Sequence, residues 1–120
     1  MWFSKRQNTA EASTYGSELL AMRVAVEMIE GLRYKLRILG VPIDGECAVF
    51  CDNNSVVTNV KPESILKKKH AVINFHRVQE AIAAGTIKVS KEHMSTNLAD
   101  ILTKSLAGPR LRELVQYILW

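Results

Sequence analysis

The segment CAVFCDNN, residues 47–54, decides the fold of this chain. Its first five residues are apolar, which is typical of a buried strand, and the three polar residues after them are typical of a strand-to-helix turn. Residues 86–90 alternate between apolar and polar side chains and indicate a second, half-buried strand. Because helical patterns lie between and around these segments, the sequence predicts an α/β fold with a parallel portion.

The longest helical pattern runs from about Tyr15 to Leu39, and Gly40 followed by Pro42 predicts its end. Apolar residues recur in it at steps of three and four, which predicts one buried stripe. The members of this predicted stripe are Leu20, Val24, Met28, Leu32, Leu36 and Leu39.

Four shorter helical patterns follow in the second half of the chain. We expect a short helix at about 54–60 and a longer one at about 66–84, with Phe75 and Val78 among its inward residues and a stop at Ala84-Gly85. Two more helices are expected from Asn97 and after Gly108-Pro109. With a short strand expected at residues 2–9, the predicted order is β-α-β-α-α-β-α-α.

Size and composition restrict the class of protein. The chain has 120 residues, of which 48% are hydrophobic and 23% charged, and this composition excludes a disordered tail, a collagen-like repeat and a coiled-coil rod. We expect no membrane span, because no run approaches the ~18 apolar residues that one needs. The start lacks the apolar region of a signal peptide, so we expect an intracellular protein, cytoplasmic or nuclear, that is not secreted.

The two cysteines, Cys47 and Cys51, lie on the first predicted strand. Along an extended strand they would be ~13 Å apart, which is too far for a disulfide. We therefore interpret both as small buried hydrophobes of a protein in a reducing compartment.

The formal net charge is +4, and its densest focus is the run Lys67-Lys68-Lys69-His70. Such a run is either a solvated helix end or a patch that contacts phosphates, in which case binding would weaken with salt. The net charge itself is compatible with a nucleic-acid partner.

Three acidic residues occupy similar places in the predicted fold. Glu18 is expected in the first turn of the long helix, Asp52 just past the end of a strand, and Asp100 in the first turn of a later helix. Each also has a structural explanation: Glu18 can complement the helix dipole, Asp52 can cap the short helix, and Asp100 has the spacing of a capping box with Asn97.

Taken together, these residues predict an acidic cluster, since functional groups of open α/β sheets gather at the carboxyl ends of the strands. Clustered carboxylates repel one another, and hard divalent cations resolve that repulsion. Two such cations can also hold the attacking and leaving oxygens of a phosphoryl transfer.

Five motifs carry a resemblance to a known family. They are WFSKRQNT with STYGSE (residues 2–9 and 13–18), FCDNNS (50–55), KKH (68–70), HRVQE (76–80) and NLADILTK (97–104). In this order and spacing the chain resembles the RNase H region of copia-type retrotransposon polyproteins. The resemblance covers roughly residues 2–106.

The resemblance implies an RNase H-like fold and hydrolysis of the RNA strand of an RNA–DNA hybrid with two Mg²⁺ ions, or Mn²⁺. Glu18, Asp52 and Asp100 match three of the family's four metal-binding acids. His93 lies in the loop where cellular RNases H carry a histidine. The resemblance further implies contacts of Asn53 and of the run Lys67, Lys68, Lys69 and His70 with the nucleic acid.

The fourth acid of the family lies on a strand before the Trp2-Phe3 segment, and nothing in this chain matches it. We therefore expect an N-terminally truncated RNase H-like domain at 2–106, with a C-terminal helical extension at 107–120 and little or no activity by itself. Besides the hybrid, the reverse-transcriptase part of the same polyprotein is a possible partner, and no small-molecule cofactor is expected.

Two alternatives to an impaired nuclease remain open from the sequence. The chain could be a non-catalytic remnant that binds nucleic acid or a partner protein, or a degenerate product that has no function. Salt-sensitive hybrid binding without cleavage would indicate the first alternative, and the absence of a cooperative melt would indicate the second.

Overall fold

The computed structural model describes residues 14–60 and 72–119. They form two strands, β1 (Cys47–Cys51) and β2 (Ile87–Lys91), and five helices. The helices are α1 (Thr14–Ile38), α2 (Asn54–Asn59), α3 (Val72–Ala83), α4 (Asp100–Thr103) and α5 (Gly108–Val115). The predicted order of elements is confirmed across these ranges. The strand expected at residues 2–9 and the start of the helix expected at 66–84 lie outside them.

The two strands pair in parallel, as predicted, with Cys47 opposite Ile87 and Cys51 opposite Lys91. The second strand lies one residue later than the alternation at 86–90 indicated. In the parallel pair both carboxyl ends lie at one edge, where the Glu92 N–H donates to the Cys51 carbonyl at 2.9 Å. This edge is where the polar residues after β1 emerge.

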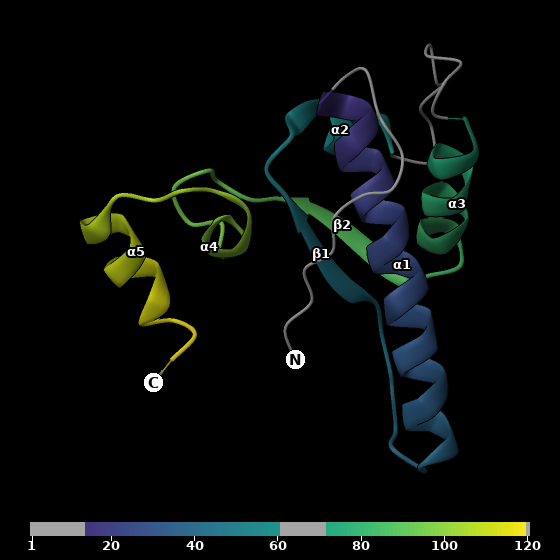
Figure 1. Ribbon diagram of the computed structural model, residues 1–120. Helices are drawn as coiled ribbons and strands as arrows, with labels where there is room; N and C mark the ends of the chain where they lie inside the picture. Colours follow the sequence, from purple (N-terminus) through teal and green to yellow (C-terminus); the bar gives the residue numbers. More distant parts are fainter. Residues whose placement is uncertain (1–13, 61–71, 120) are drawn as a thin grey trace.

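Helices α1 and α3 pack side by side against the sheet, whereas α4 and α5 lie apart from it (Figure 1). The core lies between the two long helices, α2 and the sheet. Its fully buried side chains include Leu19, Val26, Val56, Phe75 and Ile87. Polar contacts also join α1 to α3: the Arg77 guanidinium pairs with Glu30, and Arg23 donates to the side-chain Oδ1 of Asn74 at 3.1 Å.

Both predicted glycine stops are confirmed. Gly40 and Gly85 have φ of 76° and 67°, in the left-handed region that favours glycine. After α3, the Gly85 N–H donates to Ile82 and the Thr86 N–H to Ala81, which is the paired bonding of a Schellman motif. At the end of α1, the Gly40 N–H donates to Arg37 and the Val41 N–H to Leu36 in the same pattern. After each of these two helices, the chain therefore reverses direction toward the strand that follows.

The predicted buried stripe of the first helix is wrong. The residues of α1 that are buried are Tyr15, Gly16, Leu19, Met22 and Val26. Leu32 and Leu39 are exposed, at 45% and 75%, and Leu20 is only half-buried. Leu19 and Leu20 begin two stripes of similar spacing that are rotated by about 100° around the helix, and only contacts from other elements choose between them. The last turns of α1 extend beyond the sheet (Figure 1), and the hydrophobic core of the described residues contains none of their leucines.

The C-terminal helices also differ from expectation. The helix expected from Asn97 is the four-residue α4, and its Leu102 is 44% exposed, while Asp100 is buried. The last helix was expected after Gly108-Pro109, but these two residues already belong to α5, with Pro in the first turn where its missing N–H costs no bond. In α5 Leu114 is buried, whereas Leu111 is exposed.

None of the helices in the described parts of the chain combines the length and the apolar character needed to cross a membrane.

Candidate functional site

The carboxyl end of β1 brings two of the three predicted acids together. Asp52 directly follows the strand, and Glu18 reaches the same place from α1. Carboxylate oxygens of both residues and the Cys51 sulfur all lie within 4.8 Å of one another. A strand end and a neighbouring helix thus converge on one point, as the sequence indicated.

Asp100, the third predicted acid, is not in that group of three, but it is joined to it through a lysine. Lys104 Nζ lies 2.8 Å from Asp100 Oδ1 and 3.8 Å from Asp52 Oδ2. The Asp100 side chain is only 8% exposed, whereas that of Lys104 is 48% exposed. The lysine therefore approaches the acids from the solvent side and neutralises part of their charge.

A further contact links the α4 loop to the site. The Asn97 side-chain Nδ2 donates to Asp52 Oδ2 at 3.4 Å, and the Asn97 side-chain Oδ1 accepts from the Ala99 N–H at 3.1 Å. Asn97 and Lys104, which belong to the same sequence motif, thus both contact the Asp52 carboxylate. We refer to Glu18, Asp52, Asp100 and Lys104 as the acidic cluster.

The three structural explanations offered for the acids do not hold. Glu18 is the fifth residue of α1 and lies outside its first turn, where a helix dipole acts most strongly. The N-cap of α2 is Asn53, not Asp52. Asp100 makes an ion pair with Lys104, and α4 has no side-chain cap. The acids are thus close together without these local roles.

Burial and like charge both act on Glu18. Desolvation raises the pKa of its carboxyl above the ordinary value, and the neighbouring charge of Asp52 raises it further, while Lys104 opposes the shift. Burial likewise raises the pKa of the Cys51 thiol, which therefore stays protonated at neutral pH. The oxygen atoms that this site offers thus belong to carboxyl groups, and the thiol beside them is neutral.

Replacing Glu18 by Gln is expected to stabilise the fold at neutral pH by less than about 1 kcal/mol, after discounting for solvent screening of this half-exposed group. Because the pKa of Glu18 is higher in the folded state than in the unfolded state, ionisation of this carboxyl lowers the free energy of unfolding once the pH exceeds the range of an ordinary carboxyl group. Below that range the residue is protonated in both states, so the difference between the two proteins should vanish. Urea unfolding of wild type and Glu18→Gln from pH 3 to pH 7 measures this; a gap that is constant with pH would contradict it.

The other predicted site residues have separate positions. The Asn53 side chain accepts hydrogen bonds from the Ser55 and Val56 N–H groups and so caps α2. His93 is exposed in the loop after β2, with its Nδ1 at 2.6 Å from Ser95 Oγ. The run Lys67, Lys68, Lys69 and His70 lies outside the described residues.

Lys104 and Asn97 are the site residues that residue-by-residue reasoning missed. Both belong to the NLADILTK motif, but the only role predicted for Asn97 was that of a helix cap, and none was predicted for Lys104. One signal was available for Lys104, because an Asp followed by a Lys four residues later on a helix is the spacing of an ion pair.

Comparison with known proteins finds similar sequences in polyproteins of transposons. The chain is 30% identical over 104 residues, 86% of its length, to the retrovirus-related Pol polyprotein from transposon TNT 1-94 of Nicotiana tabacum. It is 26% and 27% identical over 109 residues to the Pol polyproteins from transposons RE2 and RE1 of Arabidopsis thaliana. It spans only 7–8% of the length of these relatives.

No protein-family model matches the chain, and no solved structure matches it. The mixed α/β architecture with a parallel strand pair is therefore established by the structure itself, and the relationship by sequence alone. Over most of its length, the chain is similar to a short segment of retrovirus-related Pol polyproteins from copia-type transposons.

Proposed function

We propose that this chain is an RNase H-like region derived from a retrotransposon polyprotein, with a weak metal-dependent activity on the RNA strand of RNA–DNA hybrids. The observation that carries the proposal is the convergence of Glu18 and Asp52 at the carboxyl end of β1. The similarity to Pol polyproteins supports a retroelement origin, and the five motifs support the choice of this region within such a polyprotein.

The donor set of the acidic cluster fits a hard divalent cation such as Mg²⁺. Glu18 and Asp52 offer carboxylate oxygens from two different elements, which is the ligand type that Mg²⁺ prefers. The protonated Cys51 thiol is a soft group and is a poor ligand for this ion. When bound, the ion would supply an activated water and charge stabilisation at a scissile phosphate.

The charge balance of the acidic cluster supports a weak activity. Three carboxylates and one ammonium, at neutral pH, leave two negative charges, which one divalent cation balances and two do not. Asp100 would support the site through Lys104 rather than as a direct ligand in this arrangement. A second ion would have to displace Lys104 from Asp52 and Asp100.

Binding of the hybrid would use groups around this site. The run Lys67 to His70 supplies charge for phosphates. Asn53, next to Asp52, caps α2 through its side-chain oxygen, and among residues 14–60 and 72–119 its side-chain N–H groups have no partner, so they are proposed for a further contact. His93 is accessible in a loop and is proposed to assist product release. The RNase H-like region would span residues 2–106, with 107–120 as an extension.

A second candidate function is a binding module without catalysis. The specific observation in its favour is Lys104, whose ammonium occupies the side of Asp52 and Asp100 that a cation would otherwise approach. Such a module would bind the hybrid with an affinity that falls with salt, and substituting Lys67, Lys68 and Lys69 by Ala would weaken it.

Incubation of the 120-residue chain with an end-labelled RNA–DNA hybrid tests the proposed activity. We expect slow, Mg²⁺-dependent cleavage of the RNA strand when protein is in excess over substrate, and at least tenfold less with Asp52→Asn, because a lost metal ligand costs this much or more. Single-stranded RNA of the same sequence should remain intact.

Two outcomes would contradict parts of the proposal. Hybrid binding with no cleavage above the Asp52→Asn background would favour the binding module. Rapid multiple-turnover cleavage would show that the activity is not weak, and that Lys104 does not impede the metal site.

A further inference from the structure

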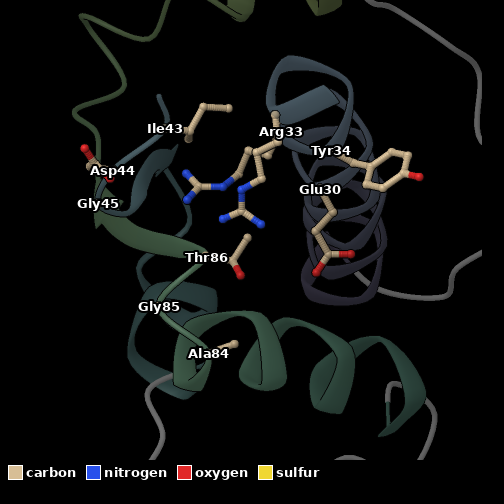
Figure 2. Close-up of a pocket in the computed structure, with 10 residues that line it drawn as sticks. Glu30, Arg33, Tyr34, Ile43, Asp44, Gly45, Ala84, Gly85 and Thr86 are labelled. Carbon is tan, nitrogen blue, oxygen red and sulfur yellow. The ribbon is translucent and has the colours of Figure 1, made fainter. Parts of the chain in front are cut away.

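A hollow at the opposite end of the sheet from the acidic cluster is lined mainly by polar and basic groups. It lies between the last turns of α1, the loop before β1 and the turn that joins α3 to β2, and has a volume of about 360 Å³ (Figure 2). Its walls include Arg33 and Arg37 from α1, Asp44 from the loop, and Thr86 before β2. This volume is sufficient for a small ligand or for one group of a larger one.

The two arginines give the hollow its chemistry. They are four residues apart on α1 and therefore lie on the same side of the helix. Figure 2 shows Arg33 extending from α1 into the space in front of Thr86, while Tyr34 points away from it. In the described ranges 14–60 and 72–119, neither guanidinium has an ion pair or a side-chain hydrogen bond.

The acidic residues of the hollow do not neutralise these arginines. Glu30 lines the hollow, but its carboxylate is already paired with Arg77 of α3. Asp44 is exposed at the edge, opposite α1, and forms no ion pair within the described residues. Two like charges that face one cavity repel each other, and an anion placed between them removes that repulsion.

We propose that this hollow binds a phosphate group through Arg33 and Arg37, with the Thr86 hydroxyl as a further donor. The guanidinium group is planar and presents paired N–H donors, which match two oxygens of a phosphate better than a lysine does. The phosphate can belong to a nucleic-acid backbone or be free in solution. The site lies away from the acidic cluster, so it does not depend on the nuclease proposal.

Phosphate titration of the 120-residue chain tests this site, with NMR signals of the arginine Nε–H groups as the readout and chloride at equal ionic strength as the reference. We expect the Arg33 and Arg37 signals to shift together. Arg33→Gln or Arg37→Gln should lower the affinity about tenfold, the loss expected for a charge-assisted hydrogen-bond pair. Lys35→Gln is the matched control: it removes the same charge from the same helix outside the hollow and should change the affinity less than twofold.

Asp44→Asn provides a second, independent test. The substitution removes the negative charge of Asp44 from the edge of the hollow and should therefore raise the affinity for phosphate. If Asp44 had only a structural role, the affinity would not change. A single-stranded oligonucleotide without terminal phosphates then separates the two sources. If its binding falls with Arg33→Gln, the ligand is a backbone phosphate, and if only inorganic phosphate responds, the ligand is free.

Three results would overturn the proposal. One is a wild-type chain whose arginine signals do not respond to phosphate. Another is an equal loss of affinity in Lys35→Gln, which would mean unspecific attraction by the basic end of α1. The third is a melting temperature that is lower for Arg33→Gln than for wild type and that added phosphate changes in neither protein. Such a result would indicate that Arg33 interacts only with the dipole of its own helix.

Discussion

Leu19→Ala is expected to destabilise the fold by about 3 kcal/mol, a central value for a fully buried leucine. Leu19 is 0% exposed and belongs to the core between α1, α3 and the sheet. Truncating it removes most of the side chain's transfer free energy and leaves a cavity that its neighbours fill only in part. For a domain of this size, that loss is a large fraction of the total stability.

Leu20→Ala is the matched control for this prediction. The same chemical change one residue later affects a half-buried side chain and should cost about 1 kcal/mol, because less apolar surface is lost from the core. Urea denaturation of both variants at pH 7 measures the difference. Equal losses, or a larger loss for Leu20→Ala, would mean that the stripe beginning at Leu20 faces the core after all.

The elements of the fold were largely predictable from local patterns, whereas the packing of α1 was not. The strand at 47–51 and the stops at Gly40 and Gly85 follow from short-range chemistry. The parallel pairing follows from the helical segments that connect the two strands. The choice between two apolar stripes on a 25-residue helix depends on which neighbours cover it, and that information lies elsewhere in the chain. The pattern of leucines therefore predicted the helix but not its buried face.

Lys104→Gln is expected to raise the affinity for Mg²⁺ about tenfold. The substitution removes a positive charge that repels the ion and partly neutralises the Asp52 and Asp100 carboxylates. The same change should lower the stability of the metal-free protein, since the buried Asp100 carboxylate loses its ion-pair partner. Added Mg²⁺ should then recover part of this stability by binding the folded state.

Melting curves of wild type and Lys104→Gln, in EDTA and in 10 mM Mg²⁺, measure both effects. Lys88→Gln is a suitable control, because this exposed lysine of β2 is not among the residues of the acidic cluster. If Lys104→Gln binds Mg²⁺ no better than wild type does, Lys104 is not in competition with the ion.

For the candidate site, the sequence predicted that Glu18 and Asp52 lie close together, but not that a lysine would separate Asp52 from Asp100. Glu18 and Asp52 meet because a strand end and a helix follow ordinary α/β geometry. The place of Lys104 between Asp52 and Asp100 depends on where the chain around the short α4 lies relative to the end of β1, which no local pattern encodes. The buried state of Asp100 has the same origin.

The central claim is that Glu18 and Asp52 bind a divalent cation, and calorimetric titration with Mg²⁺ tests it most directly. The wild-type chain should bind one ion, and Glu18→Gln should bind at least tenfold more weakly, because one of two charged ligands is lost. Glu27→Gln, the same change at an exposed position of the same helix, should bind as wild type does. Equal Mg²⁺ affinity in wild type, Glu18→Gln and Glu27→Gln would contradict the claim.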